Sequence, residues 1–205
     1  MASINKLCDR TILIDKGSVS KDGNTDQVVD YYLNQDFIGN RTTLTKEDID
    51  EIKQEQYLQS KEFFSINKIS IMDGNDIPKL QFYNNEKIKV KINFTCLSEV
   101  TDFRLNVNLY NTKHDLLMSS YFSDDPKMTQ FLTLKKGKYY WECQIPENLL
   151  GENRYIVGVS LVNLYVHHVE LKCFSIDCLF LGYNGVERLI NAGSPFKPKL
   201  KWKEI

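Results

Sequence analysis

Apolar and polar residues alternate over much of the chain after residue 63, with the period of two that is typical of β-strands. In residues 88–94, every second residue is a large apolar one, and lysine or asparagine separates these residues. The same alternation recurs in residues 103–110 and 155–162. Each of these segments is therefore expected to form a strand with one buried face and one face in water.

Shorter runs separated by turn-forming residues raise the expected number of strands to about nine. These runs lie at 64–72, 79–83, 116–122, 129–134, 138–145 and 172–181. Turn signals such as Asp73-Gly74-Asn75-Asp76 lie between them. Nothing between the strands is long enough for a crossover helix, which excludes a parallel α/β fold. The sequence thus predicts an all-β fold for residues 63–205: an antiparallel β-sandwich of the immunoglobulin-like or jelly-roll kind.

Residues 1–36 follow a different pattern, with two short strands and a helix. Asp15-Lys16-Gly17 is a strong tight-turn signal between the two strands, and Val29, Tyr32 and Leu33 then fall at helical spacing. The apolar face of this unit is too small to form a core by itself. We therefore expect residues 1–36 to be the tail of a larger domain.

Residues 37–62 are polar and are expected to form a linker between that tail and the sandwich. Thr45 is placed to cap a helix within the linker. Only Ile49 and Ile52 give this helix a weak apolar stripe.

Composition and charge exclude several classes of function. The chain has 26 basic and 27 acidic residues and a formal net charge of -1, so it has no general field to hold a nucleic-acid backbone. Its five cysteines show no CxxC spacing, and no signal-peptide pattern or apolar run of about 20 residues is present. We expect a cytoplasmic protein with free thiols. An odd separation of five residues places Cys173 and Cys178 on opposite faces of a regular strand.

The segment MASINKLCDRTILIDKGSVSKDGNTDQVVDYYL resembles the end of an ABC ATPase domain. There, a helix ending in LCDR precedes a strand, a KG turn, a second strand, DG and a helix with the pattern xxVxxYY. The chain contains no glycine-rich phosphate loop, no signature motif and no acidic pair at the end of a strand. The fragment is therefore expected to be no enzyme and to hold no cofactor, whereas the resemblance implies ATP and magnesium in a full-length parent.

An ATPase tail followed by a polar linker and a sandwich resembles the ATP-binding subunits of O-antigen polysaccharide exporters, the Wzt family, which carry a C-terminal carbohydrate-binding domain. Residues 82–88 resemble that family's F-x-x-G-E-x-l pattern before a long strand, although Asn85 replaces the glycine. Residues 134–139 and 150–155 resemble its paired G-x-Y strand openings.

The resemblance implies a non-catalytic module that binds the O-antigen polysaccharide, at a feature of the chain end, on the cytoplasmic face of the inner membrane. It couples that glycan to ATP-driven export of the lipid-linked polysaccharide. The implied partners are the glycan, a second copy in a homodimer, and a membrane permease contacted through the ATPase domain. The rival hypotheses are a dimerisation or interaction module without sugar binding, and a fragment of a carbohydrate-active enzyme.

Sugars are bound by aromatic rings that stack on C–H surfaces and by planar polar side chains that bond hydroxyls. One strand presents such groups opposite its apolar side, and a second strand presents an aromatic beside a carboxylate. An ordinary solvated face is the alternative. Trp141 has the phase of the core. The candidate carbohydrate-binding residues are Arg104, Asn106, Asn108 and Tyr110 on the first strand and Tyr140 and Glu142 on the second.

The two adjacent histidines, His167 and His168, are expected in a loop and do not predict a metal site, because no cysteine or carboxylate stands at a typical ligand spacing. A glycosidase would need two carboxylates that face each other across a cleft. The sequence contains enough acidic residues, but only a structure can show which of them form a pair, and it has no GxSxG, HExxH or GxGxxG motif.

Overall fold

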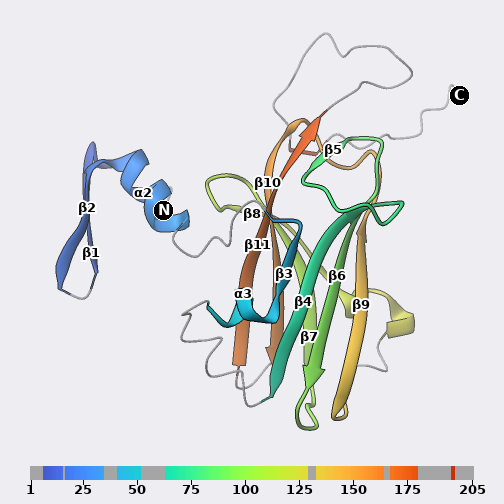
Figure 1. Ribbon diagram of the computed structural model, residues 1–205. Coiled ribbons are helices and arrows are strands. Elements are labelled where there is room, and N and C mark those ends of the chain that lie inside the picture. The colour runs from blue at the N-terminus through green and yellow to red at the C-terminus, as the bar shows by residue number, and fades with distance from the viewer. Residues whose placement is uncertain are drawn as a thin grey trace, which may run out of the picture.

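The computed structural model describes residues 7–15, 17–34, 41–51, 63–128, 133–163, 167–179 and 195–196. Over these residues the chain forms an N-terminal hairpin with one helix, followed by a β-sandwich (Figure 1). None of the described helices is long and apolar enough to span a membrane.

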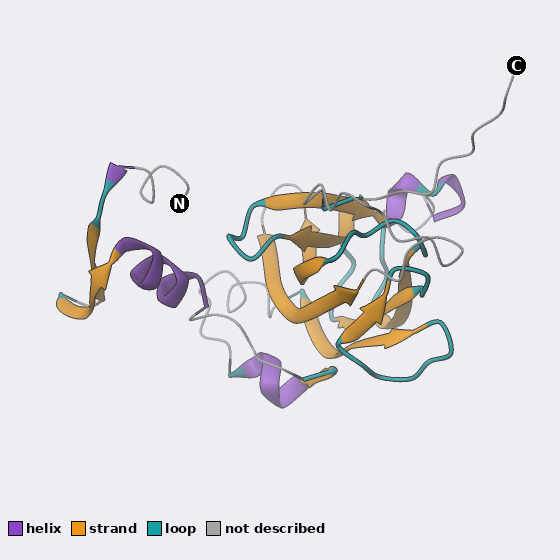
Figure 2. Ribbon diagram, turned by 90° about the horizontal axis from the view of Figure 1, so that it is seen from above, coloured by secondary structure: helices purple, strands orange, loops and turns teal. Residues whose placement is uncertain are grey.

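The N-terminal unit consists of β1 (Arg10–Asp15), β2 (Ser18–Asn24) and α2 (Thr25–Asn34). The two strands pair antiparallel, as predicted, and Figure 2 shows the hairpin and α2 to one side of the sandwich. Val28 and Val29 of α2 are buried, whereas Tyr32 of the predicted helical face is exposed; the side chain of Leu33 lies outside the described residues.

The hairpin leaves an apolar stripe exposed. The stripe consists of Ile12 and Ile14 of β1 and Val19 of β2, on the more exposed side of the hairpin. Each of these side chains is more than half exposed. Arg10 and Asp22 form an ion pair at 2.7 Å across the same hairpin. Three exposed aliphatic side chains in so short a unit are unusual for a free surface and typical of a contact surface.

The sandwich has two sheets. One sheet contains five strands in the order β5 (Gln81–Tyr83), β11 (His167–Leu179), β10 (Asn153–Asn163), β7 (Phe103–Tyr110) and β8 (Leu116–Tyr121). The other contains four strands in the order β3 (Thr43–Thr45), β4 (Phe64–Asp73), β6 (Ile88–Cys96) and β9 (Gly137–Ile145).

The predicted all-β antiparallel sandwich is confirmed. Every described pairing is antiparallel except that of β5 with β11, which is parallel and lies at a sheet edge. The strand expected at 129–134 falls mostly outside the described residues. Leu134 forms an isolated bridge with Val100.

Residues 43–50, which we expected in the linker, belong to the sandwich. Strand β3 pairs with β4, and α3 (Lys46–Asp50) follows it directly. Thr45 caps α3, as predicted, through a capping box with Asp48. Leu44 and Ile49 are fully buried in the core. The sequence does not reveal this strand, because three residues with one apolar side chain are too few for an alternating pattern.

A cluster of aromatic rings fills one part of the core between the sheets. The ring centroid of Phe103 in β7 lies 5.6 Å from that of Phe94 in β6. The ring of Trp141 in β9 lies 5.7 Å from Phe103 and 4.8 Å from Phe122. Trp141 therefore packs against the core, as its phase predicts. Phe103 and Trp141 thus identify the sides of β7 and β9 that face the core. This determines which of their residues point outward.

Tyr155 anchors the start of β10. Its buried hydroxyl lies 3.0 Å from the carbonyl oxygen of Gly151 and 2.6 Å from that of Pro195. Burial raises the pKa of Tyr155, so the phenol remains a proton donor to these carbonyls. A tyrosine that bonds backbone a few residues upstream is a feature of immunoglobulin-like sandwiches.

The expectation that Cys173 and Cys178 lie on opposite faces is wrong. The register of β10 and β11 shifts at Val157 and Gly158, which leaves Cys173 as the extra residue of a β-bulge. The bulge changes the phase of the strand, so both cysteines are buried in the core. All five cysteines are free thiols, as predicted.

Candidate functional site

The structure divides the six predicted site residues between two sheets. The row at Arg104, Asn106, Asn108 and Tyr110 lies on β7, whose Phe103, Leu105, Val107 and Leu109 belong to the core. Tyr140 and Glu142 lie on β9, on the side opposite Tyr139, Trp141 and Cys143, which pack against the core. Since β7 and β9 are in different sheets, the outer sides of these two strands face away from each other.

The outer side of β7 is closed, and three of its four predicted residues are buried. Asn106 and Asn108 are 5% exposed and Tyr110 is 6% exposed. Asn106 Nδ2 donates to Asn108 Oδ1 at 2.8 Å, and Ser119 Oγ of β8 donates to the same oxygen at 2.7 Å. Asn108 Nδ2 lies 3.0 Å from Ser160 Oγ of β10 and 3.0 Å from Glu170 Oε1 of β11.

Tyr110 closes this polar row at one end. Its ring lies over Gly158 of β10, where an added Cβ would come within 3.1 Å of the tyrosine Cε2. Arg104, at the other end, is half-buried and donates from Nη1 to the carbonyl oxygen of Phe103. The expectation that this side of the strand lies in water, where it could meet a glycan, is therefore wrong for Asn106, Asn108 and Tyr110. Neighbouring side chains take up most of the polar groups that were expected to meet a ligand.

The outer side of the four-stranded sheet is open. Figure 1 shows β4, β6 and β9 in front of the five-stranded sheet. Tyr140 is 70% exposed on this side, as predicted. It borders a cavity of about 490 Å³, which we call the basin; its lining consists of Lys68, Ser70, Met72, Lys91, Ile92, Asn93, Tyr140, Trp141 and Glu142.

Strand register explains why these side chains meet. Asn93 of β6 pairs with Lys68 of β4 and with Tyr140 of β9. One step of the pleat away, Lys91 of β6 pairs with Ser70 and with Glu142. Directly opposed residues in a sheet lie on the same face, so two rows of side chains cross three strands and form the basin.

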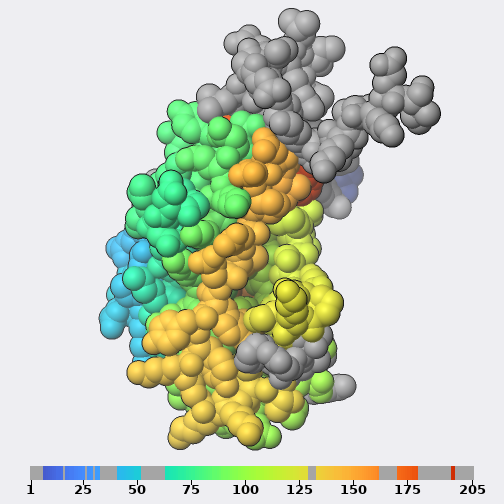
Figure 3. All heavy atoms as spheres, turned by 90° about the vertical axis from the view of Figure 1, so that its right-hand side faces the viewer, coloured from blue at the N-terminus to red at the C-terminus, as the bar shows by residue number. Residues whose placement is uncertain are grey.

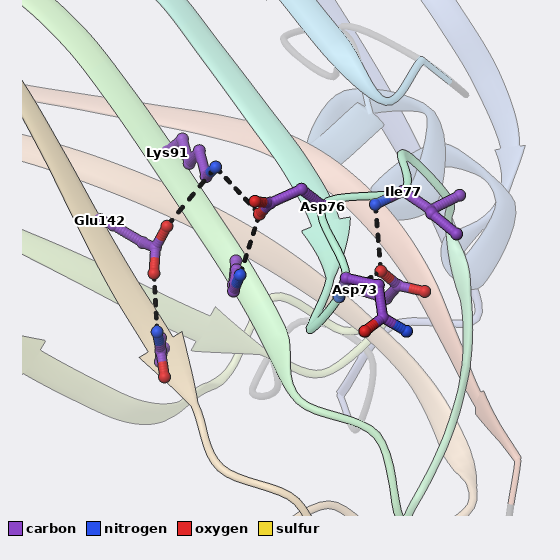
Figure 4. A network of polar contacts seen from close by, with 8 residues as sticks. Asp73, Asp76, Ile77, Lys91 and Glu142 are labelled. Carbon is purple, nitrogen blue, oxygen red and sulfur yellow. Dashed lines mark hydrogen bonds and ion pairs between the residues drawn. The ribbon is translucent and has the colours of Figure 1, made fainter.

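Charged groups are organised around Lys91 (Figure 4). Its Nζ lies 2.9 Å from Asp76 Oδ1 and 3.6 Å from Glu142 Oε2. Asp76 Oδ1 also lies 2.9 Å from Lys89 Nζ. Hydrogen bonds from the two lysines lower the pKa of Asp76, and the bond to Asp76 raises the pKa of Lys91. Glu142 Oε1 accepts a hydrogen bond of 2.6 Å from Gln144 Nε2.

A second cavity, of about 500 Å³, lies between edge strand β9 and residues 120–128; we call it the edge cavity. Figure 3 shows this side of the molecule, with β9 in gold beside the yellow residues around η1 (Phe122–Asp124). The edge cavity and the basin share Ile92, Tyr140, Trp141 and Glu142 in their linings. Asn106 also lines the edge cavity, whereas Arg104, Asn108 and Tyr110 line neither of the two.

The sequence analysis missed Lys68, Lys91 and Asn93. Their polar phase in the strands at 64–72 and 88–94 was visible, but it was assigned to ordinary solvent contact. Aligning the registers of the three strands would have placed them beside Tyr140 and Glu142. Within the described residues, no group of histidine, cysteine and carboxylate side chains could hold a metal ion. His167 and His168 begin β11 rather than lying in a loop; their side chains are outside the described part.

Comparisons with known proteins identify a shared fold. No protein-family description matches the sequence, and no curated protein matches it. Among solved structures, the C-terminal domain of Wzt matches with a TM-score of 0.52 at 8% identity, over 69% of this chain and 84% of that one. The chain has the sandwich fold of that domain.

Two further structures match more weakly. They are a Niemann-Pick type C2 protein from the Japanese carpenter ant (TM-score 0.39, 16% identity, 58% of this chain and 94% of that one) and a CARDB domain from Pyrococcus furiosus in complex with di-metal ions (TM-score 0.34, 11% identity, 58% and 96%). Neither supports an argument about function. At 8% identity, the likeness to Wzt likewise concerns the fold and transfers no residue roles.

Proposed function

We propose that the sandwich is a glycan-binding module of an ABC-type polysaccharide exporter and that the basin beside Tyr140 is its binding site. The observation that carries this proposal is the 70% exposed ring of Tyr140 at the border of a cavity whose lining includes lysine, asparagine and glutamate side chains, on a sandwich with the fold of the Wzt C-terminal domain. A large aromatic side chain so exposed above polar groups is suited to a ligand with both C–H and hydroxyl surfaces.

The basin offers both kinds of contact that sugars need. The tyrosine ring can cover the C–H face of a pyranose, and the neighbouring amide, ammonium and carboxylate groups can bond its hydroxyls. These groups come from three strands of one sheet, which fixes their spacing. A site on strands holds its geometry more precisely than a site on loops.

The proposed site binds a glycan without cleaving it, and Glu142 is the residue on which this part of the proposal depends. It is the one carboxylate in the basin's lining, and its oxygens contact Lys91 and Gln144. Glycoside hydrolysis by the usual route needs a second carboxylate across the sugar. A glycan incubated with the protein should therefore remain unchanged, and a shortened product would favour the carbohydrate-active enzyme.

In the exporter, the N-terminal unit would be the tail of the ATPase domain. The exposed stripe of Ile12, Ile14 and Val19 supports this, since it offers an apolar surface for packing against the rest of such a domain. The proposal then places the sandwich at the cytoplasmic face of the inner membrane. There it would bind the lipid-linked O-antigen and work as one of two copies beside the permease. The ATP and magnesium would belong to the ATPase domain.

Replacement of Tyr140 by alanine tests the site. We expect Tyr140→Ala to keep its melting temperature near the parent's and to lose about 1–3 kcal/mol of binding free energy for the polysaccharide of the source strain, measured by calorimetry. Tyr83→Ala is the matched control, because Tyr83 is also an exposed strand tyrosine but lies in β5 of the other sheet.

The same experiment separates the rival interaction module, which the exposed apolar stripe also favours. Parent protein that dimerises in sedimentation experiments but gives no saturable heat with the polysaccharide would support that rival. Equal affinities of the Tyr140 variant and the parent would remove the basin from the binding site.

A further inference from the structure

The basin carries an excess of cationic groups over its one carboxylate. Lys68 and Lys91 line it, and Lys89 lies beside Lys91 on the same face of β6. Lys68 is exposed and forms no ion pair with any described residue. The whole chain is nearly neutral, with a net charge of -1, so this local concentration of ammonium groups is a property of the face and not of the composition.

One carboxylate from outside the sheet partly neutralises these lysines. Asp76 lies in the turn after β4, and its Oδ1 is 2.9 Å from the Nζ atoms of both Lys89 and Lys91 (Figure 4). The preceding Asp73 holds the turn, since its Oδ1 accepts from the backbone N–H groups of Asn75 and Ile77. Asp76 itself is half-exposed and has a φ of 65°.

We propose that the basin binds an anionic group of the glycan, a carboxylate or a phosphate, between Lys68 and Lys91. In the absence of glycan, Asp76 is the counter-ion of Lys91, and the bound anion takes its place. The inference rests on the proposed function and names its substrate class. Asp76 presents to Lys91 the same chemistry, an oxygen anion at hydrogen-bond distance, that an acidic sugar would present.

Exchange of one anion for another has a small net cost at this position. Exposed ion pairs contribute little stability, because solvent already screens them. Asp76 is 53% exposed and Lys91 39% exposed, so this pair can open without burying an unpaired charge while Asp76 stays paired with Lys89, whose side chain is 14% exposed. Lys68 adds a second ammonium group, which Asp76 does not contact. A bound anion could therefore interact with Lys68 as well as Lys91, whereas Asp76 interacts with Lys91 but not with Lys68.

Three variants with a matched control test the assignment. Lys68→Gln and Lys91→Gln should each weaken binding of the native polysaccharide about tenfold, the effect of losing a hydrogen bond to a charged group. Asp76→Asn should instead tighten it about threefold, because it removes the competing charge, and asparagine tolerates the positive φ as aspartate does. Lys138→Gln should change affinity less than twofold, since Lys138 is on the same side of β9 but outside the basin.

The polysaccharide itself supplies the second arm. Carbodiimide-mediated reduction removes carboxylates, and aqueous hydrofluoric acid removes phosphates, so loss of binding after one treatment identifies the source of the charge. Titrations at low ionic strength give the largest contrast. A glycan that binds equally well after both treatments, with no weakening in either lysine variant, would overturn the inference while leaving glycan binding intact. Absence of any binding by the parent would overturn both.

Discussion

The outer sides of β7 and β9 have similar sequences of polar residues but opposite properties in the structure. On β7, the polar residues bond to the short side chains of Ser119 and Ser160, and little of them is left for solvent. Strand β9 is an edge strand, and its exposed Tyr140 lines a cavity together with the long side chains of Lys68 and Lys91. The comparison shows that alternation predicts the side on which a residue lies, whereas its neighbours in the sheet determine whether it is accessible.

The largest expected effect is on stability, at the centre of the closed side. Asn108→Ala would leave Ser160 Oγ and Glu170 Oε1 without their amide donor. It would also remove the acceptor that Asn106 Nδ2 and Ser119 Oγ share, although these two atoms still bond each other. Unpaired buried polar groups cost about 1–3 kcal/mol each, so we expect the free energy of unfolding to fall by about 2–4 kcal/mol.

Chemical denaturation measures this loss, and Gln144→Ala on the exposed side of β9 is the control. Gln144 bonds Glu142 at the surface, so its removal should change stability by less than about 0.5 kcal/mol. Similar stabilities for the two variants would mean that the β7 row is as solvated as the β9 row.

A second effect concerns the packing that closes the β7 side. In Gly158→Ala, the added Cβ would lie 3.1 Å from Tyr110 Cε2 and 3.2 Å from the backbone oxygen of Leu171. The backbone oxygen cannot turn away as a side chain can, so we expect a loss of about 1–3 kcal/mol in denaturation experiments.

Gly137→Ala, in β9, is the matched control. Its new Cβ would have Tyr139 Cε2 as its nearest neighbour at 3.9 Å, which is an ordinary contact. A Gly158 variant no less stable than the Gly137 variant would show that the Tyr110 ring moves freely over β10.

The sequence predicts the fold well where strands are long and regular. Strands β6 and β7 lie close to where alternation places them, and Trp141 packs inward. It fails where a single residue changes the phase, as at the Cys173 bulge, and where a strand is as short as β3. These features depend on pairing with a distant segment, which no local pattern contains.

The candidate site could be predicted only in part for the same reason. Tyr140 and Glu142 were found because they lie two residues apart on the same face of one strand. Lys68 and Lys91 join them through the register of β4, β6 and β9, and Asp76 through the shape of a turn. In the same way, the burial of Asn106 and Asn108 depends on Ser119 and Ser160, which are contributed by the flanking strands.

The smallest expected effect is at Arg104. A glycan site on the β7 side and one on the β9 side predict opposite results for its replacement. Arg104 ends the β7 row, is half-buried, and donates to the carbonyl oxygen of its own neighbour Phe103, a bond that the chain can replace with water. Arg104→Ala should therefore lower stability by less than about 0.5 kcal/mol and leave the affinity for the native polysaccharide within about twofold of the parent's. Calorimetry of this variant beside Tyr140→Ala compares the two faces directly. A tenfold loss at Arg104 with none at Tyr140 would move the glycan to the five-stranded sheet. The network around Asn108 would then have to open to receive it, since its amide and hydroxyl groups, apart from Asn106 Oδ1, are already bonded to one another or to Glu170.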